Sequence, residues 1–240
     1  MREFNLLQDL PQSTEPRIAT NRTIKSRIIA SERGKEFYDG NRDNGYGGYI
    51  NDGRWALVAK RIISEYNLDN KVSILHIGCD KGFLLEELKQ IYPNAYLRGL
   101  ELSYYAWKES QVRNLMRLGT FNRLQFRDKQ FNCVIASGIY SLNLAQVIDS
   151  LKEIERVCDG NSHITLGAFE TEEEEKLFRQ WTLLGTTILS KNDWLEVLDH
   201  VGYTGDYWFN TASSLNLIPP NNDRKLKEEI PVSYTHLRAH

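Results

Sequence analysis

Glycines and one acidic residue between Val72 and Glu101 have the spacing of a nucleoside-binding site. The apolar run from Val72 to Ile77 is typical of a buried parallel strand, and Gly78 and Gly82 flank the turn that follows it. Glycine has no Cβ, so the backbone there approaches a ligand closely. Glu101 closes a second strand about 20 residues later, where a carboxylate accepts both hydrogen bonds of a ribose diol. These residues predict a site for an adenine nucleoside.

The elements expected around this turn are a strand, a helix and a second strand. Phe83 to Ile91 has apolar residues at helical spacing and Pro93 lies just beyond it, while Tyr96 to Leu100 forms the second strand. The spacing from Gly78 to Gly82 lacks both the G-x-G-x-x-G of dinucleotide sites and the G-x-x-x-x-G-K-[ST] of phosphate loops. We therefore expect a looser turn that admits a methionine-like tail rather than a pyrophosphate.

Three segments carry a resemblance to a known family. HIGCDKG at 76–82 and LRGLELS at 97–103 resemble the first two motifs of class I S-adenosylmethionine-dependent methyltransferases, and FRDKQFNCVIASGIYSLN at 126–143 resembles their fourth-strand segment. The resemblance covers roughly residues 37–210. It implies an α/β, Rossmann-like class I methyltransferase fold, with a mostly parallel central sheet and helices on both faces. It also implies S-adenosyl-L-methionine as the cofactor and methyl transfer to an oxygen or nitrogen of a small acceptor.

The resemblance also implies which residues form the site. Glu101 would hold the ribose, Gly119, Thr120 and Phe121 would lie at the adenine, and Arg54 would pair with the cofactor carboxylate. The full set of expected cofactor-binding residues is Arg54, His76, Gly78, Cys79, Asp80, Gly82, Glu101, Leu102, Thr120, Phe121 and Ser137. Expected substrate contacts are Tyr46, Tyr49 and Ser141. Candidate general bases are Asp39, Tyr46, Ser141 and His163, and none is singled out; His163 begins a strand, which favours a structural role.

Two positions depart from the family pattern. His76 stands where the family has Asp or Glu, which helps to hold the amino group of the methionine moiety, and Asp80 replaces the central glycine. One interpretation is that Asp80 supplies the missing carboxylate. The alternative is a degenerate site in a non-catalytic binding or scaffold protein. The aromatic segment described next and Glu101 favour the enzyme, because a site out of use has no reason to keep them.

Residues 37–55, FYDGNRDNGYGGYINDGRW, contain five glycines and five aromatic residues. Dense glycine disfavours regular structure, whereas dense aromatic rings disfavour exposure to water. We expect a lid that closes over a ligand; a surface loop whose rings plug the core is the alternative. GYGGY and DGRW resemble a bacterial branch of these methyltransferases linked to surface-polysaccharide or small-molecule pathways. That likeness implies a sugar or sugar-derived acceptor; a macromolecular acceptor is left open.

The expected organisation is one domain with two flanking segments. Residues 1–36 form a polar, loosely attached arm, residues 37–218 the methyltransferase-like domain with its lid, and residues 219–240 a tail. PVSYTHLRAH at the end resembles a translated sequencing-adapter sequence and is treated as non-native. Within the domain we also expect a buried strand from Phe131 to Ala136 and a helix from Val147 that ends at an Asp159-Gly160 turn. Ser103 should cap the helix after Glu101, Gly202 should end a later helix, and a late antiparallel strand should start at Tyr203.

Bulk composition excludes several classes of function. The net charge of −2 gives no general reason to bind nucleic acid, and no apolar run approaches the roughly 20 residues of a membrane span. Three cysteines without C-x-x-C spacing predict neither a disulfide framework nor a zinc site, which fits a reducing cytoplasm. We expect a cytoplasmic protein without a metal and with a small-molecule acceptor; the sequence does not indicate an oligomeric state.

Overall fold

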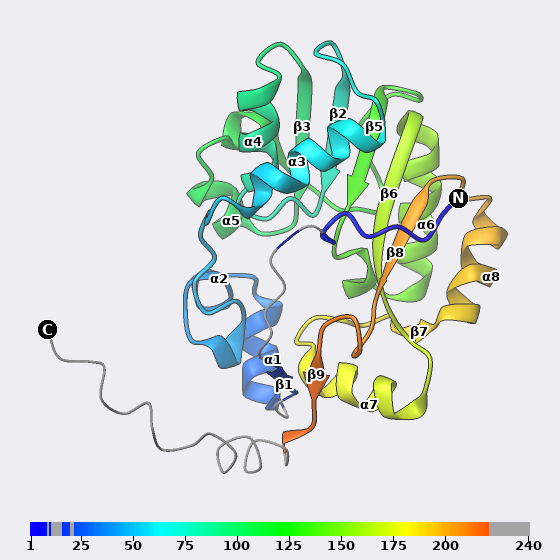
Figure 1. The fold of residues 1–240 in the computed structure, drawn as a ribbon. Coiled ribbons are helices and arrows are strands. Elements are labelled where there is room, and N and C mark those ends of the chain that lie inside the picture. Colours follow the sequence, from blue (N-terminus) through cyan, green and yellow to red (C-terminus); the bar gives the residue numbers. More distant parts are fainter. Residues whose placement is uncertain (9, 11–15, 20–21, 221–240) are drawn as a thin grey trace, which may run out of the picture.

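The computed structural model describes residues 1–8, 10, 16–19 and 22–220. Across this part of the chain, a seven-stranded sheet has the order β4-β3-β2-β5-β6-β7, with β8 also paired to β6 (Figure 1). Every pairing within it is parallel. The strands are β2 (Ser73–Ile77), β3 (Tyr96–Glu101), β4 (Met116–Leu118), β5 (Phe131–Ala136), β6 (Cys158–Phe169), β7 (Leu189–Ser190) and β8 (Asp206–Asn210).

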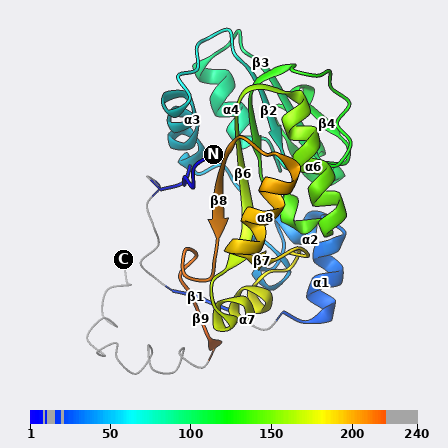
Figure 2. The same ribbon diagram turned by 90° about the vertical axis from the view of Figure 1, so that its right-hand side faces the viewer.

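Helices cover both faces of the sheet, as Figure 2 shows. α3 (Arg54–Glu65) and α4 (Phe83–Ile91) pack on one face, and α6 (Leu144–Val157) and α8 (Lys191–Val201) on the other. Successive side chains of a strand point to opposite faces, so Ile74 of β2 packs with α3 and α4 whereas Leu75 packs with α6 and α8. The expected α/β, Rossmann-like fold, with a mostly parallel central sheet and helices on both faces, is confirmed.

The strand order places a ligand crevice. From β2 the chain continues to β3 on one side, and β5 pairs on the other side of β2. In open parallel sheets, ligands bind beyond the carboxyl ends of the strands at this reversal. The lower part of Figure 1 holds the elements that face these ends. They are α1 (Ile24–Ser31), α2 (Lys35–Tyr38), α7 (Glu172–Trp181) and the paired strands β1 (Arg17–Ile18) and β9 (Leu217–Ile218), while α5 (Tyr104–Glu109) follows β3.

Several local predictions are confirmed. α4 and β5 have the expected bounds. The hydroxyl of Ser103 caps α5 by accepting from Ala106 N–H at 2.9 Å, and Gly202 ends α8 with φ 67°. These features depend on residues near one another in the sequence.

Two expectations are wrong. Asp159 and Gly160 do not form a helix-ending turn but lie within β6, because residues from Cys158 onward pair with β5. The late strand β8 runs parallel to β6, not antiparallel. Its direction follows from the connection, since α7, β7 and α8 return the chain to the end of the sheet where β6 begins.

The first residues of the chain pack against the domain rather than attaching loosely. The Arg2 side chain bonds both carboxylate oxygens of Asp206, at 3.3 and 2.6 Å. Phe4 N–H donates to the Tyr207 carbonyl at 2.7 Å, and Leu6 is only 6% exposed within the core. Most of the predicted tail, residues 221–240, lies outside the described residues. None of the helices described is both long and apolar enough to cross a membrane.

Candidate functional site

The turn after β2 has a left-handed backbone at three alternate residues. The φ angles are 69° at Gly78, 49° at Asp80 and 81° at Gly82. A Cβ at Gly78 would lie 2.2 Å from the carbonyl oxygen of Ser137, so only glycine fits there. Asp80 adopts this conformation despite its side chain; Asp tolerates it better than most residues. The turn therefore curls tightly against the carboxyl end of β5.

Glu101, the last residue of β3, holds the turn from the other side. Its side chain is buried, and its two oxygens accept the N–H groups of Asp80 and Ser103, each at 2.8 Å. Burial raises the pKa of the Glu101 carboxyl, and the neighbouring Asp80 carboxylate raises it further. The predicted ribose-binding acid is thus fixed beside the glycine turn.

Tyrosines from the predicted lid enclose the Asp80 side chain. Tyr38 donates its hydroxyl to Asp80 Oδ1 at 2.8 Å, and Tyr46 donates to Oδ2 at 3.3 Å. The Tyr46 ring lies 4.5 Å from that of Tyr49, which stacks on Phe83 at the start of α4. Burial raises the pKa of Asp80, while the hydroxyl hydrogen bonds act in the opposite direction. The segment expected to form a lid therefore lies directly on the turn.

An ion pair fastens the segment 37–55 to the turn. Lys81 Nζ lies 2.7 Å from both carboxylate oxygens of Asp39 and donates to the Tyr49 carbonyl at 3.0 Å. The Tyr105 hydroxyl also donates to Asp39, at 2.8 Å. Burial opposes ionisation of Asp39, but the hydrogen bonds from Lys81 and Tyr105 outweigh it and lower the pKa. A carboxylate paired in this way is poorly placed to act as a general base.

Arg33 connects the N-terminal helices to both sides of the crevice. Its guanidinium donates to Ser141 Oγ at 2.8 Å, and its carbonyl accepts from the Ser103 hydroxyl at 2.6 Å. Its positive charge lowers the pKa of both Asp80 and Glu101, against the larger effect of burial. Sequence reasoning did not single out Arg33, Tyr38 or Lys81 as site residues. Lys81 lies inside the glycine turn, which is the one signal that pointed to it.

The remaining predicted residues lie at different distances from this centre. His76 is buried within β2, which lowers its pKa to about 4, and its Nδ1 has no hydrogen-bond partner among the described residues. Phe121 is buried, and its ring tip lies 3.7 Å from the Cβ position of Gly78. Cys79 is also buried, and Leu102 packs partly buried against the core. Arg54 is exposed and pairs with Asp52, so it does not point at the turn in this structure.

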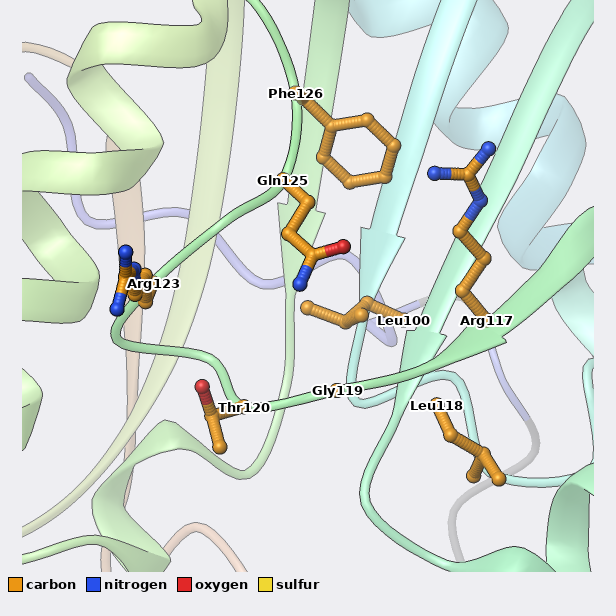
Figure 3. Close-up of a pocket in the computed structure, with 8 residues that line it drawn as sticks. All are labelled: Leu100, Arg117, Leu118, Gly119, Thr120, Arg123, Gln125 and Phe126. Atoms are coloured by element: carbon orange, nitrogen blue, oxygen red, sulfur yellow. The ribbon is translucent and has the colours of Figure 1, made fainter.

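Thr120 lines a separate groove on the outer part of the sheet. This groove has a volume of about 350 Å³ and lies between β3, β4 and the segment that leads to β5 (Figure 3). Its walls are Leu100, Arg117, Leu118, Gly119, Thr120, Arg123, Gln125 and Phe126. Thr120 and Phe121 therefore separate, one to the groove and the other to the buried side of the glycine turn.

Comparison with known proteins agrees with this geometry. Residues 75–166, from β2 into β6, match the family described as the methyltransferase domain. This central part of the chain is therefore similar to that domain. This match and the fold together indicate S-adenosylmethionine as the cofactor. No curated protein matches the sequence.

Solved structures share this fold at low sequence identity. One belongs to the complex that contains the Haloferax volcanii Trm112 methyltransferase activator, with 17% identity and a TM-score of 0.52, over 74% of this chain and 76% of that one. Another is the YcgJ protein from Bacillus subtilis, with 16% identity and a TM-score of 0.50, over 60% of this chain and 66% of that one. Likeness at this level shows the fold alone.

The residues at the turn fit S-adenosylmethionine chemically. Glu101 is a buried carboxylate at the strand end where a ribose is held. A Cβ at Gly138, just beyond β5, would meet no atom within 4 Å, so space is open on that side of the crevice. In the described part of the chain neither Asp80 nor Glu101 has an ion-pair partner within 4 Å. Two such carboxylates suit a ligand that carries positive charge.

Proposed function

We propose that this protein transfers a methyl group from S-adenosylmethionine to an oxygen or nitrogen of a small molecule. The observation that carries the proposal is the buried Glu101 carboxylate, fixed against the left-handed turn at the carboxyl end of β2. The methyltransferase match over residues 75–166 supports it. Sugars and sugar-derived precursors of surface polysaccharides are the acceptors that the N-terminal GYGGY and DGRW segments favour.

The protein's own contribution is to position and to exclude water. The cofactor supplies an activated methyl group on a positively charged sulfur when it is bound. Glu101 holds the ribose, and the residues of the glycine turn approach it closely. Tyr46 and Tyr49, half-buried over the turn, wall the acceptor side and keep water out. Holding two reactants in one orientation supplies much of the rate enhancement in such a reaction.

The structure does not single out a general base among the expected candidates. Asp39 is paired with Lys81. His163 is buried within β6, two strands away from β2, and its Nε2 lies 2.7 Å from the Phe4 carbonyl. Ser141 accepts a hydrogen bond from Arg33 and faces the crevice from beyond β5. A base is needed only for an acceptor that must lose a proton.

Isothermal titration with S-adenosylmethionine and S-adenosylhomocysteine tests the proposal. We expect micromolar binding that Glu101→Ala abolishes, and unchanged binding in Glu109→Ala, whose side chain is exposed on α5. Glu101→Gln, which keeps the side-chain volume, guards against loss of folding as the cause. If folded wild-type protein binds neither ligand, the enzyme is rejected in favour of the scaffold protein with a degenerate site.

A further inference from the structure

The carboxylate of Asp80 occupies the place where the family motif has its central glycine, and the structure surrounds it with donors. Tyr38 and Tyr46 each donate to one of its oxygens. These hydroxyls come from residues that precede the turn by 42 and 34 positions, so the contact depends on the tertiary fold. An adventitious side chain on a solvent-exposed turn would not be held at both oxygens.

The nearby cations are engaged elsewhere. Lys81, the next residue, turns away to pair with Asp39. Arg33 donates to Ser141 and acts on Asp80 only through its longer-range charge. Within the described residues the Asp80 carboxylate therefore has hydroxyl partners but no contact with a cation. A partly buried carboxylate of this kind gains most from a ligand that brings an ammonium group.

His76 does not provide the acid that the family has at its position. Burial in β2 lowers its pKa to about 4, so the imidazole is neutral at physiological pH. It supplies no negative charge toward the amino group of a bound methionine tail. Asp80, by contrast, has its backbone N–H on Glu101, and its side chain extends from the same turn toward the tyrosines.

We propose that the Asp80 carboxylate binds the α-ammonium group of the cofactor's methionine moiety, with the hydroxyls of Tyr38 and Tyr46 positioning it. This inference rests on the proposed function. The Asp80 carboxylate in the glycine turn then takes the role of the acid that the family has at the position of His76.

Three ligands separate the contacts that the inference distinguishes. S-adenosylhomocysteine keeps the ammonium but lacks the sulfonium charge, and 5′-methylthioadenosine keeps the nucleoside but lacks the amino-acid tail. We expect Asp80→Asn to weaken binding of S-adenosylmethionine and S-adenosylhomocysteine by about tenfold to a hundredfold, the effect of losing one charged hydrogen bond. Binding of 5′-methylthioadenosine should change less than about twofold.

Two further variants control the titration. Asp159→Asn makes the same chemical change at an exposed position near the amino end of β6 and should leave all three affinities unchanged. Asp80→Gly restores the family residue at a positive φ, where glycine is unstrained, but it leaves the hydroxyls of Tyr38 and Tyr46 without their acceptor; it should bind the tail more weakly. Melting temperatures establish that each variant is folded.

The inference and the proposed function fail in different ways. If Asp80→Asn or Asp80→Gly binds S-adenosylhomocysteine as tightly as wild type, the ammonium contact is wrong while the cofactor site stands. Equal loss of 5′-methylthioadenosine shows a role in the turn itself and also overturns the inference. Weakening of S-adenosylmethionine alone points to the sulfonium and overturns it too. If wild type binds none of the three ligands, the proposed function fails and the inference with it.

Discussion

At the scale of single residues, two glycines near the site differ in the space that a side chain would have. Gly78 and Gly138 both have left-handed backbone, with φ angles of 69° and 71°. A Cβ at Gly78 would lie 2.2 Å from a backbone oxygen, whereas one at Gly138 would meet open space. Substitution by alanine therefore has the same conformational cost at both glycines, but a steric cost at Gly78 alone.

This pair predicts unequal effects of the same substitution. Gly138→Ala should destabilise the protein by about 1 kcal/mol through backbone strain alone. Gly78→Ala should cost roughly 2–4 kcal/mol, because the clash with Ser137 forces the backbone to shift. Urea unfolding of the two variants measures the difference. Equal losses of stability would show that Ser137 does not pack on the turn as described.

The buried Glu101 carboxyl predicts a pH dependence of stability. Its pKa is raised above the ordinary value of 4.5 in the folded state, so protonation favours folding. Its contribution to stability is therefore complete below about pH 4.5 and is lost as the pH rises through the folded-state pKa. Glu101→Gln cannot ionise, so its melting temperature relative to wild type should rise between about pH 5 and about pH 8.

Thermal melts across this pH range measure the trend. An amide placed against the N–H groups of Asp80 and Ser103 has a constant cost. This cost shifts the melting temperature of Glu101→Gln by the same amount at every pH, so it leaves the predicted trend with pH unaffected. Glu109→Gln, at an exposed position, should track wild type at every pH. A difference between Glu101→Gln and wild type that stays flat with pH would mean that Glu101 is not desolvated.

At the scale of elements, the packing of residues 37–49 on the glycine turn depends on the ion pair between Asp39 and Lys81. Lys81 is 9% exposed, so removing its partner leaves a buried ammonium with only a carbonyl and ring contacts. Asp39→Asn should cost about 1–2 kcal/mol and speed amide hydrogen exchange over residues 37–49. Asp52→Asn breaks the exposed pair with Arg54 in the same segment, and we expect no measurable change in exchange. Equal exchange in both variants would contradict an ion pair that fastens this segment to the turn.

The sequence predicted elements well where local patterns decide them. Apolar spacing placed α4 and β5 at their observed bounds, and cap residues such as Ser103 act as expected. The predicted turn at Asp159-Gly160 is wrong because pairing of β6 with β5 overrides a local turn preference. The predicted antiparallel direction of β8 is wrong because the direction depends on the path of the chain between β6 and β8, which no local sequence pattern indicates.

The candidate site shows the same limit. Glu101 and the two glycines were predicted from spacing, and the structure brings them together. The contact of Tyr38 with Asp80 and the pairing of Asp39 with Lys81 each join residues 42 positions apart, so local sequence carries no signal for them. Arg54, expected at the cofactor carboxylate, instead pairs with its neighbour Asp52.

At the scale of the whole molecule, the start of the chain is tied to one of its last strands. Arg2 and Phe4 bond residues of β8, and Leu6 enters the core beside α3. Leu6→Ala should therefore cost about 2–3 kcal/mol, as expected for a buried leucine. Leu7→Ala is a matched control, because Leu7 is 41% exposed and should change stability by less than about 0.5 kcal/mol. Similar stabilities of the two variants in urea would show that the first residues do not pack on the domain.

The most direct test of the account is a crystal structure of the protein with S-adenosylhomocysteine. We predict density for the ligand at the carboxyl ends of β2 and β3, with both ribose hydroxyls on Glu101 and the tail on the turn at residues 78–82. Density in the groove lined by Arg117 and Phe126 instead, with the turn closed by Tyr46 and Tyr49, would contradict the assignment of the cofactor site.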